Sequence, residues 1–138
     1  MIMLIKRLAM TATVAGIMLT SATPAFASTI GVNNSGVAAA ADFSWLGQST
    51  IAGAVLYVRD TACDNNDVYA KLTLYTTAGG PVSSGTWINS SGCNTRRVVN
   101  LGTLSVAGRL TGVRITACIN DFPPDTCVSS GFLDNPNT

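Results

Sequence analysis

The stretch LTGVRITACINDFPPDTCVSS (residues 110–130) combines an alternating apolar pattern with two cysteines placed around a turn. Every second residue from Val113 to Ile119 is apolar, which is the pattern of a half-buried β-strand. Pro123-Pro124 then forces an extended corner, so the chain after it can return beside the strand. We therefore expect Cys118 and Cys127 to meet in a local hairpin and to form a disulfide.

The first 27 residues are predicted to be a signal peptide. Lys6-Arg7 precedes an apolar run at residues 8–19, and Ala25-Phe26-Ala27 has the small-x-small form of a cleavage site. Cleavage after Ala27 leaves residues 28–138, which is one domain by length. No later apolar stretch is long enough to span a bilayer. The sequence thus predicts a secreted, extracellular protein with no membrane partner after signal cleavage.

The other two cysteines, Cys63 and Cys93, complete an even set without a CxxC pair, which favours disulfides over zinc or redox chemistry. Four cysteines permit three pairings, and local closure of Cys118 with Cys127 leaves Cys63 to pair with Cys93. An internal repeat offers an alternative, since VRDTACDNND (58–67) aligns with VRITACINDF (113–122). If the repeat is structural, Cys63 and Cys118 end equivalent strands and could pair with each other.

Alternation of apolar and polar residues dominates the rest of the chain. In VYAKLTLYTT (68–77), the apolar face is formed by alternate residues from Val68 to Leu74. Residues 35–43 contain four alanines and are the one segment for which a helix remains an alternative to a strand. About seven short strands predict an all-β fold, an antiparallel β-sandwich of immunoglobulin-like type or a small barrel, with two disulfides. The further strands are expected at residues 51–60, 84–90, 96–106, 110–119 and 126–132.

The composition excludes several classes of function. The chain has no histidine and its seven acidic residues are all aspartate, so hydrolases of the Ser-His-Asp and Cys-His types are excluded. Without Lys6 and Arg7, six basic residues face seven acidic ones, and this balance argues against nucleic acid as a partner. We expect no enzymatic activity and no cofactor.

Aspartates crowd two of the expected loops. Asp60, Asp64 and Asp67 are weak candidates for calcium ligands, because the alternating spacing of an EF-hand is missing. Asp121 and Asp125 lie in the second loop. Aspartate also favours turns for local backbone bonding, and we prefer that interpretation. We therefore expect no metal to be required.

Tyrosines and arginines are the candidate binding residues. Tyr57, Tyr69 and Tyr75 could form an aromatic binding face, although in so small a sandwich we expect the second sheet to cover these rings. Arg96-Arg97 follows Cys93, as in the reactive loop of a small inhibitor of trypsin-like proteases. Adjacent strand residues point oppositely, so only one of the two arginines would be offered.

The signal peptide, YVRDTACDNND (57–67), the stretch GVRITACIND…DTCVSS and the LDNP ending (133–136) resemble small exported proteins of actinobacteria. The resemblance covers most of the chain after the signal peptide. It implies export and a disulfide-linked β fold, and it carries over no catalytic or binding residue. In size, in two disulfides and in residue bias, the chain is also similar to the chromoprotein apoproteins that carry enediynes in an immunoglobulin-like sandwich.

The sequence as a whole favours a secreted, non-enzymatic protein that binds a protein or a cell-surface ligand. A small protease inhibitor, a small-molecule carrier and a secreted antibacterial polypeptide are the alternatives. A pocket between the sheets would favour the carrier, and a rigid exposed loop at Arg96-Arg97 would favour the inhibitor.

Overall fold

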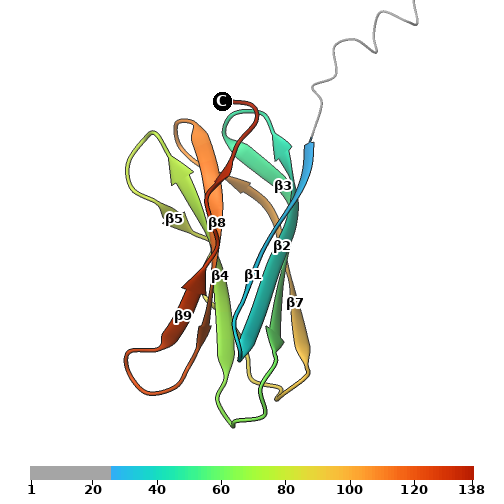
Figure 1. Ribbon diagram of the computed structural model, residues 1–138. Coiled ribbons are helices and arrows are strands. Elements are labelled where there is room, and N and C mark those ends of the chain that lie inside the picture. The colour runs from blue at the N-terminus through green and yellow to red at the C-terminus, as the bar shows by residue number, and fades with distance from the viewer. Residues whose placement is uncertain (1–25) are drawn as a thin grey trace, which may run out of the picture.

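The computed structural model describes residues 26–138, which form ten β-strands in two facing layers (Figure 1). Both layers are antiparallel sheets, as the alternating sequence predicts. The strands are β1 (Phe26–Asn33), β2 (Val37–Leu46), β3 (Thr50–Asp60), β4 (Val68–Thr76), β5 (Val82–Ser83), β6 (Trp87–Asn89), β7 (Arg96–Ser105), β8 (Leu110–Ile119), β9 (Thr126–Ser129) and β10 (Leu133–Asp134).

One sheet has four strands in the order β1-β2-β3-β7, and the other has six. In the six-stranded sheet, β10, β8, β4 and β5 follow one another, β6 pairs with β4, and β9 pairs with β8. The predicted all-β antiparallel sandwich with two disulfides is confirmed. Strand β7 pairs with β3 although three strands separate them in the sequence, so β7 forms one edge of the four-stranded sheet.

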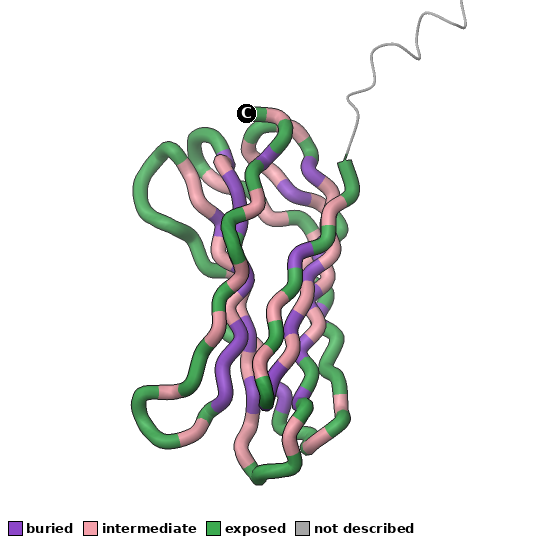
Figure 2. The backbone as a smooth tube through the Cα atoms, viewed as in Figure 1, coloured by how far each residue is buried: buried purple, intermediate pink, exposed green. Residues whose placement is uncertain are grey.

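The core lies between the two sheets and follows from the period-two pattern of the strands. Figure 2 shows buried positions recurring along them. On β4, the predicted inward residues from Val68 to Leu74 are all buried. Burying such side chains is the main contribution that stabilises the sandwich, at roughly 1.5–3 kcal/mol for each large one. The largest fully buried apolar side chains include Trp45, Ile51, Leu56, Leu72, Leu110 and Ile115.

The alanine-rich segment, for which a helix was the alternative to a strand, forms strand β2. Ala39 and Ala41 face inward in line with Phe43 and Trp45, and the residues between them face outward. Strands β1 and β3 pair with β2 on either side, so its backbone groups are satisfied by ladders rather than by helical bonds. Strand β1 was not among the expected strands.

The predicted signal peptide lies outside the described residues, except for its last two positions. Strand β1 begins at Phe26, so the predicted cleavage after Ala27 falls within that strand. Residues 26–138 contain no helix, and therefore no helix long and apolar enough to cross a membrane.

The internal repeat is structural only in part. Arg59 on β3 and Arg114 on β8 both face outward from their sheets. Cys63 lies beyond the end of β3, however, whereas Cys118 lies within β8 and is buried. The hypothesis of equivalent strand ends is therefore wrong, because β8 continues four residues further along the aligned segment.

Candidate functional site

The cysteines pair as the sequence predicts. Cys118 and Cys127 stand directly opposite each other on β8 and β9, with their Cα atoms 4.1 Å apart. Cys63 and Cys93 join the loop after β3 to the loop before β7, with Cα atoms 4.8 Å apart. Both cysteine loops lie at the end of the sandwich where the Asn120 N–H donates to the Asp67 carbonyl (2.8 Å). Two disulfides are typical of proteins in oxidising, extracellular compartments.

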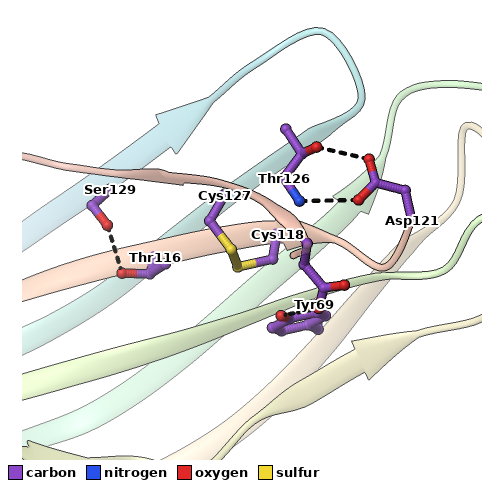
Figure 3. Close-up of a disulfide and its surroundings, with 8 residues drawn as sticks. Tyr69, Thr116, Cys118, Asp121, Thr126, Cys127 and Ser129 are labelled. Atoms are coloured by element: carbon purple, nitrogen blue, oxygen red, sulfur yellow. Dashed lines mark hydrogen bonds between the residues drawn. A yellow bond between two sulfur atoms is a disulfide. The ribbon is translucent and has the colours of Figure 1, made fainter. Parts of the chain in front are cut away.

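The turn between β8 and β9 is held by its own carboxylates (Figure 3). The Tyr69 hydroxyl donates to Oδ2 of Asp125 (2.6 Å), and this bond, with partial burial and the Asp125 charge, raises the pKa of Tyr69 to about 12. The Thr126 hydroxyl and N–H donate to Asp121 (2.7 and 3.0 Å) and lower the pKa of its carboxyl. The carboxylates of Asp121 and Asp125 therefore accept hydrogen bonds that stabilise the β8–β9 turn.

Asp60, Asp64 and Asp67 border a hollow of about 410 Å³ beside the Cys63–Cys93 disulfide. Asp60 is buried, and its Oδ1 accepts the Ala62 N–H (3.1 Å). The Asp64 carboxylate accepts the Asn66 N–H in the same way (3.1 Å). In the described part of the chain, no three aspartates or cysteines gather into a group that could hold a metal ion. These bonds are the local turn bonds that aspartate favours.

The three candidate tyrosines lie on the outer faces of two different sheets. Tyr57 is on β3, whereas Tyr69 and Tyr75 are on β4, and all three alternate with buried residues. The expectation that the second sheet covers these rings is wrong, because the inward positions of both strands are taken by aliphatic side chains. The rings do not form one aromatic face.

Tyr57 and Tyr75, both half-buried, instead each have an arginine partner on the same face. The Arg96 guanidinium carbon lies 4.9 Å from the centre of the Tyr57 ring. On the other sheet, Arg114 lies 5.9 Å from the ring of Tyr75, which also meets Phe132 edge-on at 5.4 Å. Such cation–π pairs contribute about 0.5–1 kcal/mol at exposed sites. The two faces therefore carry matching Arg–Tyr pairs.

Arg96 and Arg97 point to opposite sides, as their position on a strand predicts. Arg97 donates to the Ile88 carbonyl (2.6 Å) and lies 5.7 Å from the Trp87 ring centre, so it bridges the two sheets. Arg96 faces outward and stands opposite Arg59 in the ladder between β3 and β7. The pair lies within a sheet, not on a protruding loop.

The outer surface of the four-stranded sheet around Tyr57, Arg59, Arg96 and Val98 is called here the arginine face. Tyr57 stands opposite Val98, whose side chain is 53% exposed. At the positions of β1 and β2 that continue the rows of Tyr57 and Arg59, the residues are mostly small, so the surface of the sheet is recessed there. The result is a hollow of about 400 Å³, lined among others by Gly31, Ala38, Ala40, Tyr57, Arg59 and Arg96.

Two asparagines that were not identified from the sequence are buried at opposite ends of the sandwich. Asn89 is 2% exposed, and its side-chain amide donates to the carbonyls of Val58 (3.0 Å) and Thr95 (2.9 Å). At the other end, Asn135 is equally buried and donates to the carbonyl of Leu110 (2.8 Å). Asparagine is common in turns, so only the paired strands distinguish these two from the rest.

The arginine face also could not be read from the sequence, because the adjacency of Arg59 and Arg96 depends on the pairing of non-consecutive strands. Tyr57 and Arg96 were candidates, but Arg59 and Val98 were not. No family model, curated protein or solved structure matches this chain.

Proposed function

We propose that the chain is an exported, non-enzymatic binding protein and that the arginine face contacts a protein or cell-surface ligand. The observation that carries this proposal is the hollow of about 400 Å³ beside the Arg59–Arg96 pair. Arginine and tyrosine are the residue types that most often dominate binding energy at protein interfaces. The exposed Val98 adds an apolar contact next to them.

The position of the hollow favours this function over the alternatives. The hollow opens on the outside of a sheet, while core side chains such as Trp45 and Leu72 occupy the space between the sheets. A small-molecule carrier is better served by a pocket between sheets, where most of the ligand surface is buried. A protease inhibitor is disfavoured because Arg96-Arg97 lies within β7.

The test is a pull-down of the exported protein against the producer's isolated cell wall and culture proteins. Its sharpest form compares two double variants of the same kind, Tyr57→Ala/Arg96→Ala and Tyr75→Ala/Arg114→Ala, which remove the Arg–Tyr pair from one outer face each. We expect only the first variant to lose the ligand. Equal retention by both variants contradicts the proposed face.

Recovery of the chain from the culture medium tests export. Mass analysis of its N-terminus then tests cleavage after Ala27.

A further inference from the structure

We propose that the ligand of the arginine face is an extended, carboxylate-bearing peptide segment of a partner protein, which adds to β7 as a fifth strand. This inference rests on the proposed function and specifies its ligand. Three features carry it, namely the free edge of β7, the side chains along that edge, and the charge of the Arg59–Arg96 pair.

Strand β7 ends the four-stranded sheet, and no strand of residues 26–138 pairs with its far side. The Asp60 N–H bonds to the Thr95 carbonyl (3.0 Å), which sets the phase of the antiparallel ladder. Alternation along β7 then turns the backbone groups of Arg97 and Val99 toward β3. Those of Arg96, Val98 and Asn100 are directed to the free edge, where an added strand can bond to them.

The free stretch of the edge is short. Arg97 bridges to β6 at one end of β7. At Gly102, whose φ is 69°, the register between β7 and β3 shifts. A bulge of this kind bends a strand and limits further pairing. The free edge therefore fits about six residues of an incoming chain, from Arg96 to Leu101.

The side chains along this edge determine which side chains of an added strand can pack against it. Arg96, Val98 and Asn100 all face outward and are exposed. Directly opposite residues in neighbouring strands have Cβ atoms about 4.5–5.5 Å apart, so each would contact one side chain of the added strand. Val98, backed by Tyr57, favours an apolar side chain opposite it.

The charge of the arginine face requires an acidic residue in that strand. Arg59 and Arg96 stand directly opposite each other, and like charges in that position repel. Among the described residues, the Arg59–Arg96 row and the Tyr57–Val98 row of this outer face hold no carboxylate, since their remaining positions are Asn33, Ala38, Gly31 and Ala40. The first carboxylate along the face is that of Asp42, in the row of Asn100. A carboxylate beside Arg96 would offset the repulsion and accept charge-assisted hydrogen bonds. A second copy of β7 would bring further arginines instead.

The test uses the purified exported protein and two blocked hexapeptides, Val-Thr-Thr-Val-Thr-Asp and the same peptide with Lys in place of Asp. In an antiparallel added strand, the fourth and sixth residues of these peptides stand opposite Val98 and Arg96. We expect the Asp peptide alone to give saturable changes in the NMR amide signals of Val98 and Asn100. Arg96→Ala should weaken this binding by about tenfold, the size expected for losing a charge-assisted hydrogen bond. The control Arg114→Ala should leave the affinity unchanged.

Three results overturn the inference. The first is the absence of amide changes on β7, and the second is equal binding of the Lys peptide. In the third, inorganic polyphosphate binds through Arg59 and Arg96 while the Asp peptide does not, which would assign the face to an anionic polymer. If the pull-down still depends on the arginine face in that case, the proposed function stands and only the peptide inference fails.

Discussion

Asn89 shows how much of this small sandwich depends on a single buried polar side chain. Both amide hydrogens are used, and Oδ1 accepts the Ser91 N–H (3.0 Å). The bonds tie β6 in one sheet to β3 in the other and to the loop before β7. A buried amide is tolerated only when it is bonded in this way, because its desolvation is otherwise unfavourable.

Replacing Asn89 by alanine is expected to lower the free energy of unfolding by about 1–3 kcal/mol, since it removes these bonds and leaves space in the core. Asn33, which is exposed on β1, is the matched control, and its alanine variant should stay within about 0.5 kcal/mol of the wild type. Urea unfolding measures both. Equal effects would mean that Asn89 does not join the sheets.

The Tyr69 hydroxyl makes the stability of the protein depend on pH in the alkaline range. Its pKa of about 12 in the folded protein lies above the ordinary value of 10.0, so the folded state holds the hydroxyl proton more tightly than the unfolded chain. The stabilisation is complete below pH 10 and is lost as the pH rises toward 12. We expect the stability advantage of the wild type over Tyr69→Phe to shrink across this range in denaturant titrations. A constant difference would contradict the role of the Asp125 bond.

At the level of elements, the long alternating strands and the short strands β6 and β9 were predicted, whereas β1, the small-residue strand β2 and the two-residue strands β5 and β10 were not. The predicted ranges 51–60, 96–106 and 110–119 match β3, β7 and β8 within one residue at each end. Strand β2 was missed because alanine by itself favours a helix over a strand, and only the pairing with β1 and β3 makes this segment a strand. The Arg59–Arg96 contact escaped because strand order is a property of the sheet, not of local sequence.

The attachment of β10 depends on the absence of a side chain at Gly112. A Cβ at this position would lie 2.5 Å from the Leu133 carbonyl oxygen and would also meet the Phe132 ring. Gly112→Ala is therefore expected to displace β10 and to cost about 1–3 kcal/mol of stability. Gly131→Ala, where a Cβ meets nothing within 4 Å, is the control.

Hydrogen exchange of the Asn135 amide, which bonds to the Thr111 carbonyl (2.9 Å), reports the displacement of β10. It should become faster only in the Gly112→Ala protein. Unchanged exchange would show that β10 accommodates the methyl group.

For the whole molecule, the two disulfides supply a large share of a small stability. The chain-entropy model gives about 2.7 kcal/mol for closing the loop from Cys118 to Cys127 and about 3.7 kcal/mol for the longer one from Cys63 to Cys93. A domain of this size has about 5–15 kcal/mol in total. A domain of roughly a hundred residues has only a modest hydrophobic core, and it therefore needs its two disulfides for stability.

Replacing each cysteine pair by alanines is expected to lower the urea midpoint, and more for Cys63/Cys93 than for Cys118/Cys127. The smaller effect also follows because hydrogen bonds from Thr126 and Tyr69 still close the β8–β9 turn. Loss of both pairs should leave the chain unfolded or nearly so at 37 °C. The reverse order of the two single-pair variants would contradict the loop-length argument.

Both disulfides lie at one end of the sandwich, while β1 starts and the chain ends at the other (Figure 1). A pulling force applied through the two termini therefore acts first on β1 and β10, which only hydrogen bonds and packing hold. The Cys63–Cys93 bridge, with its sequence separation of 30, removes about 100 Å from the length to which the chain can extend. Under mechanical load the domain should lengthen partly and then stop, and a reductant should release the rest.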